Sequence, residues 1–285
     1  MSAPSGYELG DAFAQDKTGV LYRAVQTRLD RPVTLKILKA AYVDNERARD
    51  LFLAERDVLT GVEHPNVLLT IDVGEWERRP WFVTETVAEP RLNETMRAGQ
   101  ALEERRAIRI ALGIARGLNY LSERGLIYKN VRPKNILLPR PAAPKLVTFR
   151  YVRRIEEAAS FQGANVQSGL YCAPELTRTD FGEVSTKANV YALGSILYRM
   201  LAGAPPVEGK SAEAREAHAR GNVVPLKERR PYLRDRAYAV VDHLLAPNPR
   251  DRAGPAVAVA LLEAYENDPL VTNPPRKKRK TRRRR

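Results

Sequence analysis

The sequence has 285 residues, of which 44% are hydrophobic and 29% charged, an ordinary composition for a soluble globular protein of one large domain or two lobes. A single cysteine, Cys172, excludes an internal disulfide and fits a reducing compartment. No apolar run approaches the ~20 residues of a membrane helix, and the N-terminus lacks the apolar core of a signal peptide. We therefore expect a cytoplasmic location, or a membrane-proximal one if the chain is a fragment.

The net charge of +14 is concentrated at the C-terminus. Arg276 to Arg285 hold nine basic residues and no acid, so the other 275 residues carry only +5. The run follows Asn273–Pro275, and we expect residues 271–285 to form a disordered polybasic tail. Such a tail suits nucleic-acid phosphates or an anionic membrane surface, and in a eukaryote also a nuclear-localisation signal. It contains no aromatic residue, which disfavours base stacking.

The first part of the chain is rich in predicted strands. Residues 7–39 alternate strand-like runs with turns. Residues 45–60 have helical spacing of their apolar side chains. Two more strand-like runs follow, Val67–Val73 and Trp81–Val87. These patterns predict a small sheet with one main helix.

From about residue 102 the hydrophobic period changes to 3.6, which predicts helices. One apolar face is formed by Ile108, Leu112, Ala115, Leu118 and Leu121. This helix should end before Gly125, and a second amphipathic helix should contain Val190–Leu201. The last third of the chain is expected to be helical throughout. We place the joint near Glu85–Glu89, which gives a first lobe at 1–86 and a second at 87–270.

Short motifs occur in a fixed order along both parts. The central stretch contains Tyr128-Lys129-Asn130, then Asn135 five positions after Asn130, then Thr148-Phe149-Arg150. The others are Val33-Thr34-Leu35-Lys36, Glu55 nineteen positions after Lys36, Tyr171-Cys172-Ala173-Pro174-Glu175, Asn189-Val190-Tyr191-Ala192-Leu193-Gly194 and Asn248-Pro249-Arg250-Asp251-Arg252. Each motif alone is weak, and their common order carries the interpretation.

Together the motifs resemble the bacterial branch of the eukaryotic-like (Hanks-type) serine/threonine protein kinases over residues 7–265. The resemblance implies an α+β, bilobal protein-kinase fold with a five-stranded antiparallel sheet plus one helix in the N-lobe and a mainly helical C-lobe. It also implies an ion pair between Lys36 and Glu55 that steadies a nucleotide phosphate. A second, partly buried pair between Glu175 and Arg252 should tie the activation segment to the C-lobe.

The carboxylates that carry the chemistry of this family are absent. In the family pattern His-Arg-Asp-x-x-x-x-Asn the Asp takes the substrate proton, but Asn130 stands at that position and an amide is no useful base. Thr148 replaces the magnesium-binding Asp of Asp-Phe-Gly. Asn189 replaces the Asp that braces the catalytic loop, although its carbonyl could still accept those bonds. Arg132 replaces a lysine. Sequence drift with activity retained is the alternative, yet three carboxylates lost together favour an inactive protein.

The expected nucleotide site departs from the family as well. Ala14 and Asp16 replace the first two glycines of the glycine-rich loop, Gly19 keeps the third, and Asp16 puts a negative charge beside the phosphate position. The expected nucleotide-contacting residues are Leu21, Thr34, Lys36, Glu55, Glu85, Val87, Asn135 and Leu137. Leu21 and Thr34 are larger than the usual Val and Ala, which predicts a narrowed adenine pocket.

Cationic side chains gather where phosphates would lie. They are Lys36, Arg132, Lys134 and Arg150. We expect nucleotide binding to be weak or absent, any ATP binding to be independent of magnesium, no cofactor to be required and no metal site to exist. The alternative is that Arg150 faces solvent or bridges to Glu55 and occludes the site.

These features predict a pseudokinase, that is, not an enzyme but a signalling regulator or scaffold that binds an unknown protein partner. The first alternative is an atypical but active serine/threonine protein kinase, in which Asn135 and the basic cluster position ATP. The second alternative is a module that binds nucleic acid or an anionic membrane through Arg276 to Arg285.

Overall fold

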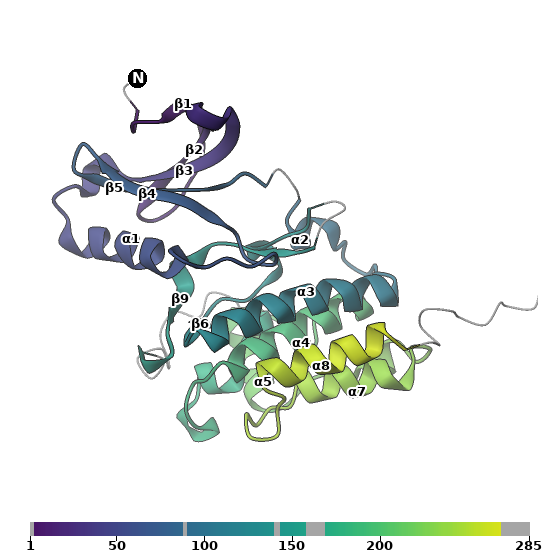
Figure 1. The fold of residues 1–285 in the computed structure, drawn as a ribbon. Coiled ribbons are helices and arrows are strands. Elements are labelled where there is room, and N and C mark those ends of the chain that lie inside the picture. The colour runs from purple at the N-terminus through teal and green to yellow at the C-terminus, as the bar shows by residue number, and fades with distance from the viewer. Residues whose placement is uncertain (1–2, 88–89, 140–142, 158–168, 269–285) are drawn as a thin grey trace, which may run out of the picture.

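The computed structural model describes residues 3–87, 90–139, 143–157 and 169–268. A strand-rich lobe lies above a larger helical lobe (Figure 1). The chain passes from the first lobe to the second near residue 86. This arrangement confirms the α+β, bilobal fold predicted from the motifs. The predicted polybasic tail, residues 271–285, lies outside the described residues.

The N-lobe is an antiparallel five-stranded sheet in the order β1-β2-β3-β5-β4. Its strands are β1 (Tyr7–Gln15), β2 (Gly19–Gln26), β3 (Arg31–Leu38), β4 (Thr70–Trp76) and β5 (Arg79–Glu85). The alternation in β3 buries Val33, Leu35 and Ile37 in one apolar cluster with Trp81, and turns Lys36 toward the opposite face. The sheet therefore presents one lysine to the side where the main helix packs.

That helix, α1 (Glu46–Leu59), begins at Asn45, whose side chain accepts a hydrogen bond from the Ala48 N–H at 2.9 Å. It buries Phe52, Glu55 and Leu59. The helix thus carries a carboxylate into the space beneath the sheet, opposite the lysine of β3.

The strands β4 and β5 are shifted from the predicted ranges 67–73 and 81–87. The reason is that Val67 forms a parallel bridge with Leu146 of the C-lobe, which starts β4 only at Thr70. Residues 67–69 therefore lead from the contact with the C-lobe into the sheet, where the Leu69 oxygen accepts a hydrogen bond from the Glu85 N–H at 3.0 Å.

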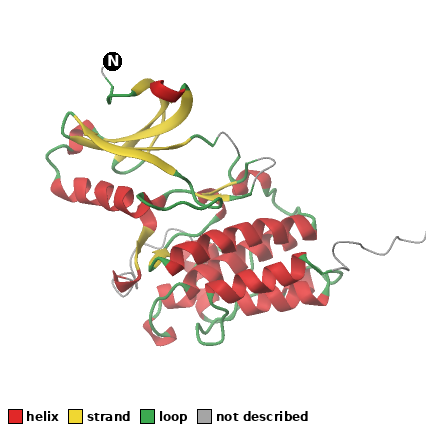
Figure 2. Ribbon diagram, viewed as in Figure 1, coloured by secondary structure: helices red, strands yellow, loops and turns green. Residues whose placement is uncertain are grey.

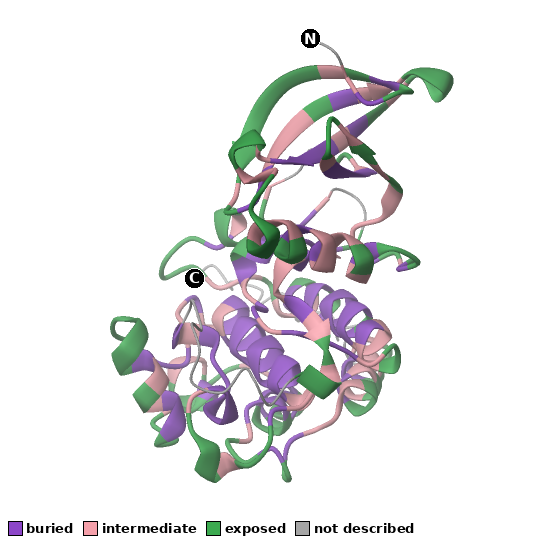
Figure 3. Cartoon of the chain, turned by 90° about the vertical axis from the view of Figure 1, so that its left-hand side faces the viewer, coloured by how far each residue is buried: buried purple, intermediate pink, exposed green. Residues whose placement is uncertain are grey.

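The C-lobe is built around two long buried helices (Figures 2 and 3). Its helices are α2 (Leu92–Thr95), α3 (Glu104–Glu123), α4 (Lys187–Ala202), α5 (Ser211–Ala219), α6 (Leu226–Arg229), α7 (Asp235–Leu244) and α8 (Pro255–Glu266). Helix α3 packs against α4 on one side and α8 on the other. Because α3 packs against other helices, its buried side chains recur with the 3.6-residue period that the sequence shows.

Two short antiparallel pairs line the joint between the lobes. They are β6 (Leu126–Tyr128) with β9 (Val152–Arg154), and β7 (Ile136–Leu137) with β8 (Lys145–Leu146). The loops that connect these four strands contain Asn130, Asn135 and Thr148. The two strand pairs therefore hold these three residues, which are candidate site residues, against the N-lobe. In the described part of the chain, no helix combines the length and apolar character needed to cross a bilayer.

Candidate active site

Lys36 and Glu55 form a buried ion pair under the N-lobe sheet. The Lys36 ammonium lies 2.6 Å from the Glu55 carboxylate, and each residue is only 4% exposed. Gly19 permits this approach, because a Cβ there would meet the Lys36 Cε at 2.6 Å. The rings of Phe52 and Phe82 flank the ammonium at 5.5 and 5.4 Å. The contact predicted from the nineteen-residue spacing is present, with helix α1 turned inward.

The loop after β6 is held by hydrogen bonds from its own polar residues. The Asn135 side chain donates to the backbone oxygen of Asn130 at 2.9 Å, and the Val147 N–H donates to the Asn135 oxygen at 3.0 Å. The Tyr128 hydroxyl donates to the Val147 oxygen. These bonds fix Asn130 and Asn135 relative to each other and to the strand before Thr148.

The Asn130 side chain is buried, and its amide nitrogen has no hydrogen-bond partner among the described residues. A buried donor without a partner is costly and uncommon. The Asn130 amide thus carries a buried donor in this loop, and it cannot accept a proton as a carboxylate does.

Asn189 braces the same loop from α4. With the amide oriented so that its oxygen faces the Tyr128 N–H, it accepts that hydrogen bond at 3.1 Å and donates to the Tyr128 oxygen at 2.7 Å. These two hydrogen bonds require one acceptor oxygen and one N–H donor in the side chain of residue 189, and an amide supplies both. The exchange of an acid for an amide at residue 189 thus leaves the loop braced.

Thr148 has a left-handed backbone conformation, with φ of 71° and ψ of 59°. This region is unfavourable for a β-branched residue, and such strain concentrates at functional sites. The next residue, Phe149, is buried and stacks on Tyr128 with ring centroids 5.9 Å apart. Packing of the following side chain therefore holds Thr148 in a conformation that threonine does not prefer.

Asp16 reaches from the glycine-rich loop to the cations of the site. Its carboxylate lies 2.9 Å from the Lys36 ammonium and 3.3 Å from the Arg150 guanidinium. Arg150 was predicted either to bind an anion, to face solvent or to bridge to Glu55. It pairs with Asp16 instead. The sequence indicated a negative charge beside the phosphate position, but not that this charge would span the lobes.

Not all four of the predicted cationic side chains lie near Asp16. Lys134 is exposed, and its backbone oxygen accepts a hydrogen bond from Arg91 at 2.6 Å. Arg132 is half-buried in the loop after β6. Among the described ion pairs, Asp16 contacts only Lys36 and Arg150. The candidate anion site therefore consists of one lysine and one arginine.

The predicted adenine-side residues lie along the joint. Leu21, Thr34, Glu85, Val87 and Leu137 are all partly exposed. The Thr34 hydroxyl lies 3.3 Å from the Thr86 hydroxyl. The Glu85 carboxylate is engaged by the Lys145 ammonium at 2.7 Å. Whether these residues bind nucleotide stays a prediction.

The activation-segment end is tied down as the motif order implied. Arg252 makes a two-pronged contact with Glu175, with distances of 2.5 and 3.0 Å, and both side chains are fully buried. This pair lies in the C-lobe, away from the cations, and its role is structural.

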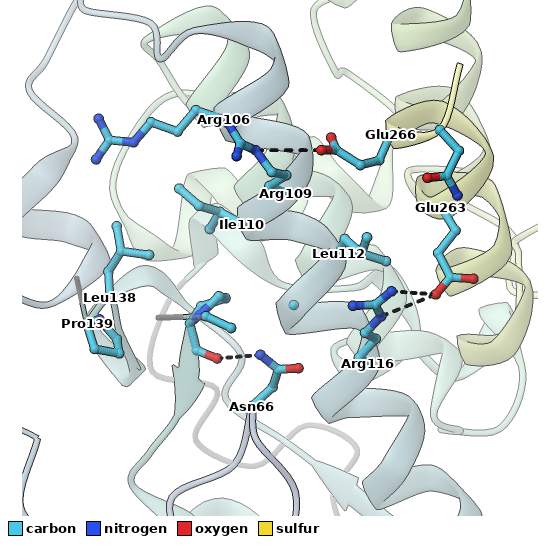
Figure 4. Close-up of a pocket in the computed structure, with 14 residues that line it drawn as sticks. Asn66, Arg106, Arg109, Ile110, Leu112, Arg116, Leu138, Pro139, Glu263 and Glu266 are labelled. Atoms are coloured by element: carbon cyan, nitrogen blue, oxygen red, sulfur yellow. Dashed lines mark hydrogen bonds and ion pairs between the residues drawn. The ribbon is translucent and has the colours of Figure 1, made fainter. Parts of the chain in front are cut away.

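A separate cavity of about 600 Å³ lies on the other side of the C-lobe, between α3 and α8 (Figure 4). Arg116 binds Glu263 at 2.8 Å, and Arg109 approaches Glu266 at 3.7 Å, while Arg106 extends away from both acids. None of the residues of the Lys36 and Asn130 site lines this cavity. It is therefore not the candidate active site.

The inward lysine–glutamate pair, the braced loop and the two-lobed fold together define a protein-kinase domain. Comparison with known proteins agrees: residues 7–263 match the family described as protein kinase domain, and the chain belongs to that family.

Several bacterial proteins are similar to the chain. The serine/threonine-protein kinase PknB of Mycobacterium leprae is 29% identical over 253 residues, which cover 86% of this chain and 40% of the relative. The PknB of Mycobacterium tuberculosis gives 29% identity over 254 residues, with the same coverage. The serine/threonine-protein kinase PknL of Mycobacterium bovis is 28% identical over 277 residues, 93% of this chain and 66% of PknL. The chain thus spans about two fifths of the PknB proteins.

Two expectations from the sequence are corrected by these findings. The chain was expected not to be an enzyme, but its family and its relatives are protein kinases, and this contradicts that expectation. It was also expected to need no cofactor and to bind any ATP without magnesium, whereas protein kinases use ATP with magnesium. The expectation rested on the carboxylates lost at residues 130, 148 and 189, although the Asn189 carbonyl could still accept the bonds of the brace. The described contacts keep Asn130, Asn135 and Asn189 in ordered positions.

Magnesium prefers oxygen ligands and usually keeps water and substrate phosphates in its shell. Asn135 uses its amide nitrogen on the backbone of Asn130, which leaves its amide oxygen available. No group of three or more acidic, histidine or cysteine side chains suited to a metal occurs in the described residues. Asn135 would supply one amide oxygen to a magnesium ion that arrives with ATP, and the phosphates and water would supply its other ligands.

Proposed function

We propose that the chain is the kinase domain of a serine/threonine protein kinase that transfers the γ-phosphoryl group of ATP at a low rate. The observation that supports this most is the Lys36–Glu55 ion pair, buried and 2.6 Å long, which is the arrangement that positions phosphates in active kinases. The names of the similar proteins supply the acceptor class, serine and threonine hydroxyls.

In the proposed reaction, the hydroxyl oxygen of the substrate forms a bond to the γ-phosphorus while the bond to the leaving oxygen of ADP breaks. The transition state of such transfers is loose, so catalysis depends on positioning and electrostatic stabilisation more than on early proton removal. The hydroxyl proton can then pass to an oxygen of the transferred phosphoryl group. No carboxylate base is needed for the atoms and charges to balance.

Three residues of the chain have separate roles in the proposed reaction. Lys36 binds phosphate oxygens, and Asn130 orients the acceptor hydroxyl through its amide. Asn135 would hold the magnesium ion, which neutralises phosphate charge when bound. Without a positioned general base we expect a loss of about 10²–10⁴ in rate. From the usual 1–100 s⁻¹ of protein kinases, turnover should be on the order of 10⁻⁴ to 1 s⁻¹.

The test is phosphate incorporation from ATP and magnesium into a generic protein substrate. Lys36→Met should abolish it. Lys39→Met is the matched control, because Lys39 follows β3 and its side chain makes no ion pair or hydrogen bond with a described residue. Melting curves of both variants exclude unfolding as the cause. Incorporation that is absent from the wild type, or that survives Lys36→Met, would refute the proposal.

A further inference from the structure

The Asp16 carboxylate is surrounded by hydrogen-bond donors in the pattern of a bound anion. One oxygen accepts from the backbone N–H groups of Thr18 at 3.1 Å and Gly19 at 2.9 Å. The other lies 2.9 Å from the Lys36 ammonium and 3.3 Å from the Arg150 guanidinium. Two loop amides, a lysine and an arginine are the groups with which proteins bind phosphate. Here they hold a side chain of the protein itself.

The donors come from both lobes. Lys36 belongs to β3, the amides belong to the end of the β1–β2 loop and the first residue of β2, and Arg150 follows Phe149 in the C-lobe. Burial by itself would raise the pKa of the Asp16 carboxyl, but the Lys36 charge and the hydrogen bonds lower the pKa overall. Asp16 therefore stays charged in this position and links the glycine-rich loop to the C-lobe.

The site also has unused capacity. The Nε atom of Arg150 is buried and has no hydrogen-bond partner among the described residues. A carboxylate has two oxygens and both are already engaged, whereas a phosphate group brings additional acceptor oxygens. Arg150 Nη1 faces the carboxylate and Nη2 donates to the Tyr151 hydroxyl at 2.7 Å. The two amides, Lys36 and Arg150 are thus a donor set that also suits the additional oxygens of a phosphate.

The balance of charges disfavours the simultaneous presence of the Asp16 carboxylate and a nucleotide phosphate in this site. Lys36 and Arg150 supply two positive charges, and Glu55 with Asp16 supplies two negative charges. A polyphosphate added to this neutral cluster would meet the Asp16 carboxylate at short range, in a partly buried site where repulsion is weakly screened. Release of Asp16 removes the repulsion and frees four donors.

We propose that Asp16 is an internal competitor for nucleotide phosphates: its carboxylate occupies the anion position formed by Lys36, Arg150 and the Thr18 and Gly19 amides, and ATP binds only after it leaves. This regulation rests on the proposed kinase function. It makes the glycine-rich loop self-inhibiting, since the closed loop delivers the competitor.

Two simpler roles for Asp16 are less consistent with these contacts. A carboxylate that only caps its own turn needs the two loop amides but neither Lys36 nor Arg150. A carboxylate that serves as a magnesium ligand would be expected away from cations, and Asp16 touches two. The experiment separates these roles from the proposed one.

The decisive variant is Asp16→Asn, which keeps an oxygen for the loop amides but removes the charge that holds Lys36 and Arg150. Asp11→Asn is the matched control, because Asp11 is exposed on β1 and makes no side-chain hydrogen bond or ion pair with a described residue. If the competitor occupies the site about 90% of the time, its removal strengthens apparent affinity about tenfold. We therefore expect Asp16→Asn, and not Asp11→Asn, to lower the Kd for ATP with magnesium about tenfold.

The same titration with inorganic tripolyphosphate probes the anion position without the adenine pocket, and should show the same difference between variants. Unchanged binding of both ligands by Asp16→Asn would overturn the proposal, as would weaker binding accompanied by lost magnesium dependence, the signature of a metal ligand. Phosphate incorporation is measured on the same samples. Tighter binding without incorporation would refute the kinase function alone, whereas incorporation without tighter binding would refute the competitor alone.

Discussion

Arg252 is the side chain whose loss should damage the fold most. It is fully buried, and five hydrogen bonds use all of the N–H donors that a guanidinium has. The acceptors are the two oxygens of Glu175 and the backbone oxygens of Ala246, Lys187 and Pro247. The arginine therefore joins the activation-segment end, the start of α4 and the loop before α8.

The size of the effect follows from which groups remain unpaired. Arg252→Met removes the arginine charge from the buried Glu175 carboxylate and its N–H donors from three carbonyl groups, so we expect a loss of about 3–5 kcal/mol in unfolding free energy. Glu175→Gln keeps the shape, and Arg252 retains its three carbonyl acceptors. That variant should lose about 1.5–3 kcal/mol, the value of hydrogen bonds to a charged group. Arg250→Met, at an exposed neighbour, should stay within about 0.5 kcal/mol of the wild type.

The assay is urea unfolding followed by circular dichroism, with the slope of the transition compared between variants to confirm that the same surface is exposed. The expected order of destabilisation is Arg252→Met, then Glu175→Gln, then Arg250→Met. A Glu175→Gln variant that is at least as unstable as Arg252→Met would refute the reasoning, because the three carbonyl contacts would then contribute nothing.

Three further predictions concern rate, pH and charge. Asn130→Asp restores a carboxylate base and should raise phosphate incorporation by about 10²–10⁴, and an unchanged rate would exclude residue 130 from proton transfer. His218 lies between the Tyr191 hydroxyl and the Leu170 oxygen, and burial lowers its pKa from 6.5 to about 4, so the unfolded chain binds more protons between these values. Stability should fall as pH drops from 6.5 to 4, and His218→Gln should flatten that part of the stability–pH curve. Deletion of residues 276–285 should weaken duplex DNA binding and its salt dependence, and equal affinity with and without them would remove the tail as an anion-binding element.

The fold could be predicted from the sequence because its signals are local. Lys36 and Glu55 occupy a strand and a helix whose periodicity is plain, and their spacing places both on facing sides of one lobe. The order of short motifs then specifies the C-lobe. Strand ends were less accurate, since Val67 pairs with Leu146 across the joint, and a contact between residues so far apart leaves no periodic signal.

The state of the site could be predicted only in part. Residue types identify lost functional groups, as at Asn130 and Thr148, but they do not show how well the remaining side chains are still positioned. Asn189 illustrates the difference: the negative charge is lost, but the carbonyl could still accept the brace bonds, and the amide supplies both hydrogen bonds to Tyr128. The expectation that the chain is not an enzyme gave most weight to the lost carboxylates, and residue types alone do not show which exchanges preserve geometry.

The contact between Asp16 and Arg150 joins two departures that seem unrelated in the sequence. Each replaces a glycine of the family pattern, one in the glycine-rich loop and the other after Phe149. An arginine alone at residue 150 would add an unpaired, partly buried cation, and an aspartate alone at residue 16 would repel nucleotide phosphates without a C-lobe partner. Together they form an ion pair across the joint, 3.3 Å long. The two exchanges are best understood as a single interaction, in which the N-lobe supplies a carboxylate to a site that lacks the C-lobe carboxylates of the family pattern.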